Sequence, residues 1–158
     1  SGNFVTYVGG DGMVGDDLFT GIDAGSVEGM IATRAGAFEG ESATVYADLA
    51  TAAGLTPNDV YAPQSYDAAF LLALAIEKNG SADREGLSAA LREVSSAPGE
   101  TILPGEWEKA KELIAAGTDI DYQGAGGDLD FDDAGDVDGV IVEMTVEGGS
   151  FVEVGVIE

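Results

Sequence analysis

The stretch Ala62–Asn79, APQSYDAAFLLALAIEKN, determines how the rest of the chain must be arranged. Its residues 68–76 are all apolar, and a helix that is apolar on every side is buried rather than laid on a surface. Ser65 is placed to cap the amino terminus, and Asp67 then falls in the first turn, where the helix dipole favours a negative charge. Gly80 is placed to end the helix. We therefore expect a central helix from Ser65 to Asn79, covered on both sides.

Composition limits the classes of partner. The chain has 158 residues, which indicates one domain or pieces of two, and 45% of them are apolar, which disfavours disorder. It carries 30 acidic and 6 basic residues, a formal charge of −24. A nucleic-acid partner is excluded because no basic patch could neutralise phosphates, and an anionic membrane surface is excluded by the same sign argument. Solubility in a salty medium explains this acidity more simply than cation binding, because salt screens the repulsion.

Cysteine and histidine are both absent. The chain therefore has no disulfide, thiol nucleophile or thiolate metal site, and it lacks the commonest general base and zinc ligand. We expect no metal and no cofactor. We also expect no enzyme activity, because any pair of carboxylates that resembles a glycosidase site would arise by chance among so many acidic residues. No signal peptide or transmembrane span is recognised. Ser1-Gly2 is either a cloning remnant or native sequence.

The first candidate site is the turn Gly9-Gly10-Asp11-Gly12, which follows an expected strand over 3–8. Glycines let the backbone approach another group closely and leave Asp11 at the carboxyl end of that strand. In open α/β sheets this is where ligands bind. From spacing alone, an ordinary glycine-rich turn is the favoured interpretation. The turn does not satisfy the dinucleotide or P-loop patterns.

The remaining elements follow from hydrophobic periodicity and turn residues. We expect a short helix over 16–22, a strand over 26–33, helices over 41–53, 83–95 and 106–116, and strands over 139–146 and 151–157. The expected core positions are Val27, Met30, Ile31, Val45, Leu49, Ala52, Leu87, Ala90, Leu91, Val94, Trp107, Ala110, Leu113 and Ile114.

The acidic run Asp128–Asp138, DLDFDDAGDVD, is compared with a calcium loop. Started at Asp128, the EF-hand template fails at its glycine and at its final glutamate; started at Asp130, it fails at the fifth and final positions. A hairpin explains the run better, with Phe131 inside and a turn over 132–135.

The order of a strand, GGDG, EGMIAT, YAPQSYDAAFLLALAIEKNG and DIDYQGAGGDLDFDDAGDV resembles the carboxyl-terminal half of a type I periplasmic binding protein. The resemblance covers nearly the whole chain and is nearest to the branched-chain amino-acid (leucine/isoleucine/valine) receptors of ABC importers. It implies an α/β fold of two Rossmann-like lobes that close on a ligand, with a β-rich carboxyl-terminal tail.

Two residues match the family's ligand-binding positions. Asp11 matches the acidic residue that holds the ligand's α-ammonium, and Tyr61 matches an aromatic residue that lines the side-chain pocket. A tyrosine simply packed at a helix start is an equally good interpretation of Tyr61. The groups that bind the ligand's carboxylate belong to the family's amino-terminal half, which this chain does not contain.

The resemblance also implies the domain organisation and partners. Residues 1–34 and 138–158 would belong to one lobe and residues 35–137 to the other, and each lobe would need a complementing amino-terminal half or a swapped dimer. By itself the chain would bind amino acids weakly or not at all. The implied function is the substrate-binding component of an ABC importer for amino acids or small amides. The implied partners are that ligand and a membrane permease, and the implied location is the periplasm. The alternative is a ligand-sensing receptor or regulator without a transport role.

Overall fold

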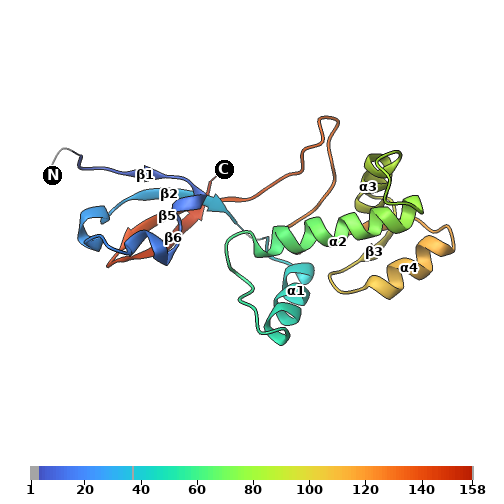
Figure 1. Cartoon of the computed structure of the whole chain (residues 1–158), viewed down its shortest axis with the longest axis horizontal. Helices are drawn as coiled ribbons and strands as arrows, with labels where there is room; N and C mark the ends of the chain where they lie inside the picture. Colours follow the sequence, from blue (N-terminus) through green and yellow to red (C-terminus); the bar gives the residue numbers. More distant parts are fainter. Residues whose placement is uncertain (1–3, 37, 158) are drawn as a thin grey trace. The chain divides into compact units, whose positions relative to one another are not determined.

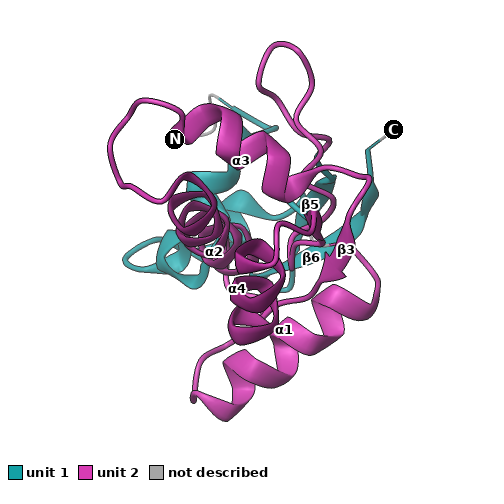
Figure 2. Cartoon of the chain, turned by 90° about the vertical axis from the view of Figure 1, so that its right-hand side faces the viewer, with its two compact units in different colours: residues 1–36, 139–158 teal, residues 37–138 magenta. Residues whose placement is uncertain are grey.

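The computed structural model describes residues 4–36 and 38–157 (Figure 1), so that Ser1, Gly2 and Asn3 lie outside the described part. The chain divides into two compact units, the first made of residues 1–36 and 139–158 and the second of residues 37–138 (Figure 2). The chain therefore leaves the first unit, forms the second and returns.

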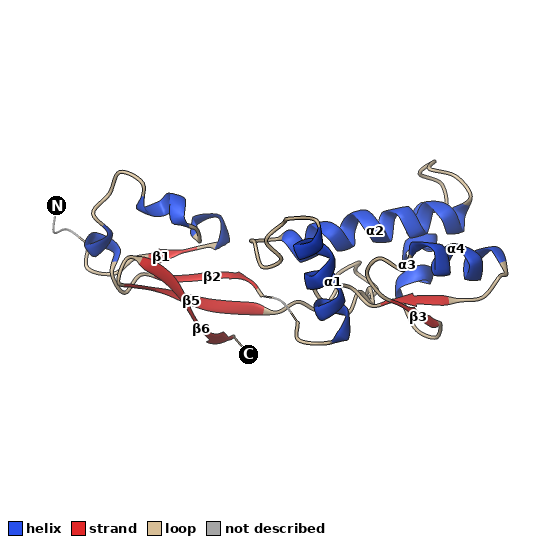
Figure 3. Ribbon diagram, turned by 90° about the horizontal axis from the view of Figure 1, so that it is seen from below, coloured by secondary structure: helices blue, strands red, loops and turns tan. Residues whose placement is uncertain are grey.

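The first unit is built on a four-stranded sheet with the order β1-β2-β5-β6 (Figure 3). Its strands are β1 (Val8–Gly9), β2 (Ile31–Ala35), β5 (Ile141–Glu147) and β6 (Ser150–Val156). β1 runs parallel to β2, whereas β5 is antiparallel to both β2 and β6. The carboxyl-terminal hairpin is thus joined to strands from the first quarter of the sequence.

The two faces of this sheet are in different environments. One face is buried under 3-10 turns, which are η1 (Asp11–Met13), η2 (Asp16–Phe19) and η3 (Ala24–Val27). Its core residues are Val27, Met30, Ala32, Val142, Met144 and Val146. Cross-strand partners share a face, so the register places Val8, Ile31, Ile141 and Val152 together on the other face, where all four are exposed.

The second unit is mainly helical. Its helices are α1 (Glu41–Ala52), α2 (Ala62–Asn79), α3 (Leu87–Ser95) and α4 (Trp107–Ala115). A parallel pair of short strands, β3 (Glu100–Ile102) and β4 (Ile120–Tyr122), completes it. The buried core joins α2, α3, α4 and this strand pair through Leu71, Leu74, Ala75, Ala90, Val94, Ile102, Ala110, Ile120 and Tyr122.

The central helix is present but begins earlier than expected. It starts at Ala62, with Tyr61 as its N-cap residue, so the prediction of Ser65 as the cap is wrong. The reason is Pro63, whose fixed φ suits the first turn of a helix. At the other end, Gly80 ends the helix with a φ of 68°, as predicted.

The prediction that α2 is covered on both sides is wrong for the described chain. Its buried residues Asp67, Leu71, Leu74 and Ala75 lie on one side, while Leu72 is 43% exposed. The reason is that α3, α4 and the two short strands pack against one side of the helix only.

The first strands also differ from the predictions. Within the described residues, the strand expected over 3–8 contains only Val8, which begins β1, and Gly9 continues it. The strand expected over 26–33 begins at Ile31, because Gly29 takes a φ of 73° after the turn η3. Val27 and Met30 are buried as expected, but Ile31 is 40% exposed because it lies on the open face of the sheet.

The sequence predicts where the helices lie better than it predicts which of their residues are buried. The fourth helix and its inward residues are confirmed, and the third begins four residues late because Gly86 has a φ of 80°. In α1 the buried residues are Tyr46 and Ala50 rather than Val45, Leu49 and Ala52. The rotation follows from Tyr46, whose ring packs 5.2 Å from that of Tyr66 between centroids.

The hairpin predicted over 128–138 is not formed. Asp132 folds the segment into a loop, because its carboxylate accepts hydrogen bonds from the backbone N–H groups of Ala134, Gly135 and Asp136. Phe131 does pack against the core, and β5 pairs with β2 and β6 instead.

The described residues contain neither a metal-binding cluster nor a membrane-spanning helix. No three or more acidic side chains lie where they could hold a metal ion together. No helix in residues 4–36 and 38–157 is both long and apolar enough to cross a membrane.

Candidate ligand-binding site

Asp11 lies just beyond the carboxyl end of β1, in the first unit. The strand ends at Gly9, and Asp11 opens the 3-10 turn η1 two residues later. The N–H of Gly12 donates to Asp11 Oδ1 over 2.7 Å, which orients the carboxylate, and the residue is exposed. The carboxylate of Asp11 therefore lies on the exposed surface just beyond the carboxyl end of β1.

The glycines beside Asp11 differ in whether packing requires a residue without a side chain. A Cβ on Gly9 would lie 2.5 Å from Met30 Cε and 3.1 Å from Met13 Sδ, so packing accounts for this glycine. A Cβ on Gly10 or Gly12 would meet nothing within 4 Å, and neither residue has a positive φ. The described chain therefore gives no packing reason for glycine at these two positions, and the space above them is open.

Tyr61, in the second unit, has an unusual backbone conformation. Its φ of 63° and ψ of 6° make it the one non-glycine residue with a positive φ in the described part of the chain. That conformation costs roughly 1–2 kcal/mol for an ordinary side chain. Tyr61 is 42% exposed, and its carbonyl oxygen accepts a hydrogen bond from the N–H of Ser65. Strain of this kind is concentrated at ligand sites and switch regions.

The two predicted site residues belong to different units, Asp11 to the first and Tyr61 to the second. Their use in a common site therefore stays a prediction.

A buried carboxylate that the sequence did not reveal organises the second unit. Asp67 is only 2% exposed, and its Oδ1 accepts from the hydroxyl of Tyr122 at 2.7 Å and from the N–H of Ala125 at 2.8 Å. Its Oδ2 accepts from the N–H of Gly126 at 2.7 Å. Burial, followed by the neighbouring Asp67 carboxylate, raises the pKa of the Tyr122 hydroxyl, which stays protonated and donates.

This network fixes the glycine-rich loop after β4 onto α2. A Cβ on Gly124 would lie 2.8 Å from Asp67 Oδ2, so the loop can approach the carboxylate only with glycine at that position. The sequence interpretation placed Asp67 in the first turn of the helix, as a charge favoured by the dipole, because it started the helix too late. The signal that could have revealed the network is the run Tyr122-Gln123-Gly124-Ala125-Gly126, whose small residues let a buried side chain approach the backbone closely.

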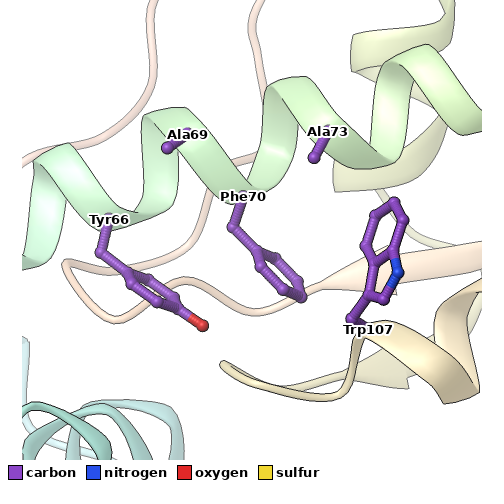
Figure 4. A pocket seen from close by; sticks show the side chains of 5 residues that line it. All are labelled: Tyr66, Ala69, Phe70, Ala73 and Trp107. Atoms are coloured by element: carbon purple, nitrogen blue, oxygen red, sulfur yellow. The ribbon is translucent and has the colours of Figure 1, made fainter. Parts of the chain in front are cut away.

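An apolar groove lies along α2 in the same unit (Figure 4). Its volume is about 330 Å³, and it is lined by Tyr66, Ala69, Phe70, Ala73 and Trp107. The rings of Tyr66 and Phe70 are stacked with centroids 5.7 Å apart, and Trp107 meets Phe70 edge-on at 6.3 Å. Burial raises the pKa of the Tyr66 hydroxyl, and the nearby backbone of Gly105 partly offsets this rise. Within the groove, the walls are ring carbons and methyl groups.

The chain matches a family model described as the receptor family ligand binding region, over residues 26–146. The chain belongs to this family. Its mixed α/β fold is that of the type I periplasmic binding proteins, as the sequence resemblance implied.

Two known proteins are similar to this chain. The chemotactic signal transduction system substrate-binding protein BasB of Halobacterium salinarum is 34% identical over 95 residues, which are 60% of this chain and 23% of that protein. The crystal structure of a leucine binding protein, LivK, from Thermotoga maritima matches 97% of this chain with a TM-score of 0.62 at 23% identity. The chain covers 37% of that structure, so the matched part is well under half the length of either relative. Both are described as binding proteins.

Proposed function

We propose that this chain is part of a binding protein for amino acids or related small amides, and that the Asp11 carboxylate holds the ligand's ammonium group. The observation that supports this most is the position of Asp11, exposed at the carboxyl end of β1 between two glycines with open space around them. A carboxylate and an ammonium shielded from water form a short, charge-assisted hydrogen bond.

Tyr61 is the second proposed ligand contact. Its strained backbone and half-exposed ring support this role, because a glycine or asparagine would take the same conformation at lower cost. An apolar ring is suited to contact the aliphatic side chain of a branched-chain amino acid.

The two units are proposed to be parts of two lobes. Residues 1–34 and 138–158 would belong to one lobe and residues 35–137 to the other. The division of the structure into residues 1–36 with 139–158 and residues 37–138 supports this assignment.

The biological role has two candidates. One is delivery of the ligand to the membrane permease of an ABC importer, which the similarity to a leucine binding protein supports. The other is ligand sensing without transport, which the chemotactic relative favours. Both roles place the protein outside the cytoplasmic membrane. Uptake of radiolabelled ligand and chemotaxis toward it, measured in a strain that lacks the gene, would distinguish them: loss of uptake supports the importer, and loss of chemotaxis alone supports the sensor.

The site is tested with an Asp11→Ala variant of the complete gene product, titrated calorimetrically with leucine, isoleucine and valine. Loss of one partner of a desolvated charge pair costs about 3–5 kcal/mol, so the dissociation constant should rise at least a hundredfold. Asp17→Ala is the matched control, because Asp17 is also exposed in the next 3-10 turn and should leave affinity unchanged. An affinity for the Asp11 variant within threefold of the parent protein would remove Asp11 from the site.

A further inference from the structure

Asn79 is the one asparagine of the chain that is followed by a glycine. It is the last residue of α2, and Gly80 then takes a φ of 68° and ends the helix. In an Asn-Gly pair the backbone nitrogen of the glycine can attack the carbon of the side-chain amide, because glycine has no Cβ to hinder the approach. The pair is therefore chemically reactive unless the fold holds the two groups in other contacts.

The side-chain amide of Asn79 is held inside the loop that joins α2 to α3. Its Nδ2 donates to the carbonyl oxygens of Ser81, at 3.0 Å, and Glu85, at 3.1 Å, which uses both of its hydrogens. On the other side of the amide, a Cβ on Gly86 would lie 2.5 Å from Asn79 Oδ1. The loop over residues 80–86 thus wraps around one side chain, although most of its own residues are exposed.

The attacking nitrogen is engaged as well. The N–H of Gly80 donates to the carbonyl oxygen of Glu77 at 3.3 Å, in the last turn of the helix. Attack on the amide carbon requires this hydrogen bond and the two donated by Asn79 to break together, which requires local opening of the loop. The folded loop therefore slows the reaction, and its opening permits it.

We propose that Asn79 is a deamidation site whose reaction is controlled by opening of the loop over residues 80–86. In the open loop the nitrogen of Gly80 bonds to Asn79 Cγ and the C–N bond of the amide breaks. A cyclic imide forms, and ammonia leaves with the proton that the Gly80 nitrogen has lost. Water then opens the imide at either carbonyl, which leaves an aspartate or an isoaspartate at position 79.

The product cannot close the loop in the same way. A carboxylate has no hydrogen to donate, so it would face the carbonyl oxygens of Ser81 and Glu85 as a further acceptor. It also adds a negative charge to a chain whose formal charge is −24. Gly86 is the N-cap residue of α3, and its carbonyl oxygen accepts from the N–H of Ala90. Deamidation therefore loosens the start of α3 irreversibly.

The tripeptide Asn79-Gly80-Ser81 also fits the acceptor pattern for N-glycosylation. A sugar would replace one of the two hydrogens on Asn79 Nδ2, and both are donated within the folded loop. The structure therefore favours deamidation over glycosylation, and the mass of the peptide distinguishes the two.

The reaction is measured on the complete gene product, incubated in mildly alkaline buffer with and without guanidinium chloride. Peptide mass spectrometry gives the fraction of position 79 that has become a carboxylate. We expect conversion to be at least about tenfold slower without guanidinium, because the loop is then closed most of the time. Equal rates in the two conditions, no conversion in either, or a sugar on the peptide of the protein purified from its own cells would each overturn the proposal.

Gly86→Ala tests the control exerted by the loop. The added Cβ would collide with Asn79 Oδ1, and alanine disfavours the φ of 80°, so deamidation in native buffer should become at least about fivefold faster. Gly54→Ala is the matched control, because Gly54 follows α1 with a φ of 74° and a Cβ there would meet nothing within 4 Å. Faster deamidation in both variants, or in neither, would show that the loop does not control the reaction.

The effect on α3 is measured independently, in case Gly86→Ala does not fold. Asn79→Asp mimics the product, and Asn58→Asp adds the same charge at an exposed position outside the loop. Hydrogen exchange at the amide of Ala90 should be at least about threefold faster in Asn79→Asp than in the parent protein, and unchanged in Asn58→Asp. Parental exchange in Asn79→Asp would overturn the claim that deamidation releases the loop.

Discussion

Among single residues, Asp67 has the largest structural role in the second unit. It is buried in α2 and accepts three hydrogen bonds, one of them from a tyrosine 55 residues away in the sequence. Removing one partner of a buried network leaves the others unsatisfied, which costs more than the hydrogen bond contributes.

We expect Asp67→Asn to lower the free energy of unfolding by about 3 kcal/mol, because the amide NH₂ would face backbone N–H donors at one of its positions. Tyr122→Phe is the comparison: it removes one donor but keeps the two backbone donors, and should cost about 1 kcal/mol. Urea unfolding followed by circular dichroism measures both. If Asp67→Asn costs no more than Tyr122→Phe, Asp67 does not hold the loop.

Tyr61 is the second residue whose role can be separated by mutation. Asparagine tolerates a positive φ, so Tyr61→Asn should leave the thermal midpoint unchanged or raise it slightly, while ligand affinity falls about tenfold because the ring is lost. Tyr61→Phe keeps the ring and should bind within threefold of the parent protein. Parental affinity in Tyr61→Asn would show that the tyrosine only packs at the start of the helix.

At the scale of elements, side chains rather than strand pairing hold the acidic segment 128–138 in its conformation. Asp132 caps the backbone amides of the turn that follows it, and the guanidinium of Arg92, which lies 5.8 Å from the centre of the Phe131 ring, donates to the carbonyl oxygens of Phe131 and Asp132. The pKa of the Asp132 carboxyl is lowered, mainly by the N–H of Asp136 and then by those of Gly135 and Ala134.

The lowered pKa gives a pH prediction for this loop. A carboxyl whose pKa is lower in the folded state stabilises that state above its unfolded pKa of about 3.9 and loses this contribution as pH falls through the lowered value. Hydrogen exchange at the amides of Ala134, Gly135 and Asp136 should therefore lose protection as the pH is taken below about 4. Asp132→Ala should abolish this protection already at neutral pH, and Asp133→Ala should not. Identical protection in the two variants would show that the loop is held in another way.

Helices with a clear hydrophobic periodicity and a terminating glycine could be predicted from the sequence. Segments whose conformation is set by side-chain hydrogen bonds to the backbone could not. The fourth helix was placed within one residue at each end because its inward residues recur at helical spacing and Gly117 follows it. The segment over 128–138 alternates like a strand, yet Asp132 offers its backbone an alternative set of hydrogen bonds. Competition of this kind depends on rotamers that a sequence pattern does not contain.

At the scale of the whole molecule, the formal charge of −24 is the dominant physical feature. The described ion pairs join exposed or partly exposed side chains, and such pairs contribute little. Repulsion among the remaining carboxylates therefore opposes the folded state at low salt.

We expect the thermal midpoint to rise between about 0.1 M and 2 M KCl, because the screening length falls from about 10 Å to below 3 Å. Sucrose at matched osmolality, which does not screen charge, should raise the midpoint less. A midpoint that is independent of KCl would mean that repulsion between carboxylates is not limiting.

The family and the location of Asp11 at a strand end could be predicted from sequence, whereas the buried network and the apolar groove could not. GGDG and the run from Asp119 to Val137 are local patterns that a reader can match in order. The contacts of Asp67 and the neighbours of Phe70 come from segments that are distant in the sequence, and only their three-dimensional packing brings them together.

The central claim, that Asp11 holds the ammonium of a small ligand, is tested most directly by a crystal structure of the complete gene product grown with leucine. The account predicts an Asp11 carboxylate oxygen about 2.7–2.9 Å from the ligand nitrogen, the distance of a charge-assisted hydrogen bond. A bound ligand whose nitrogen is held by other groups, with Asp11 left in solvent, would contradict it.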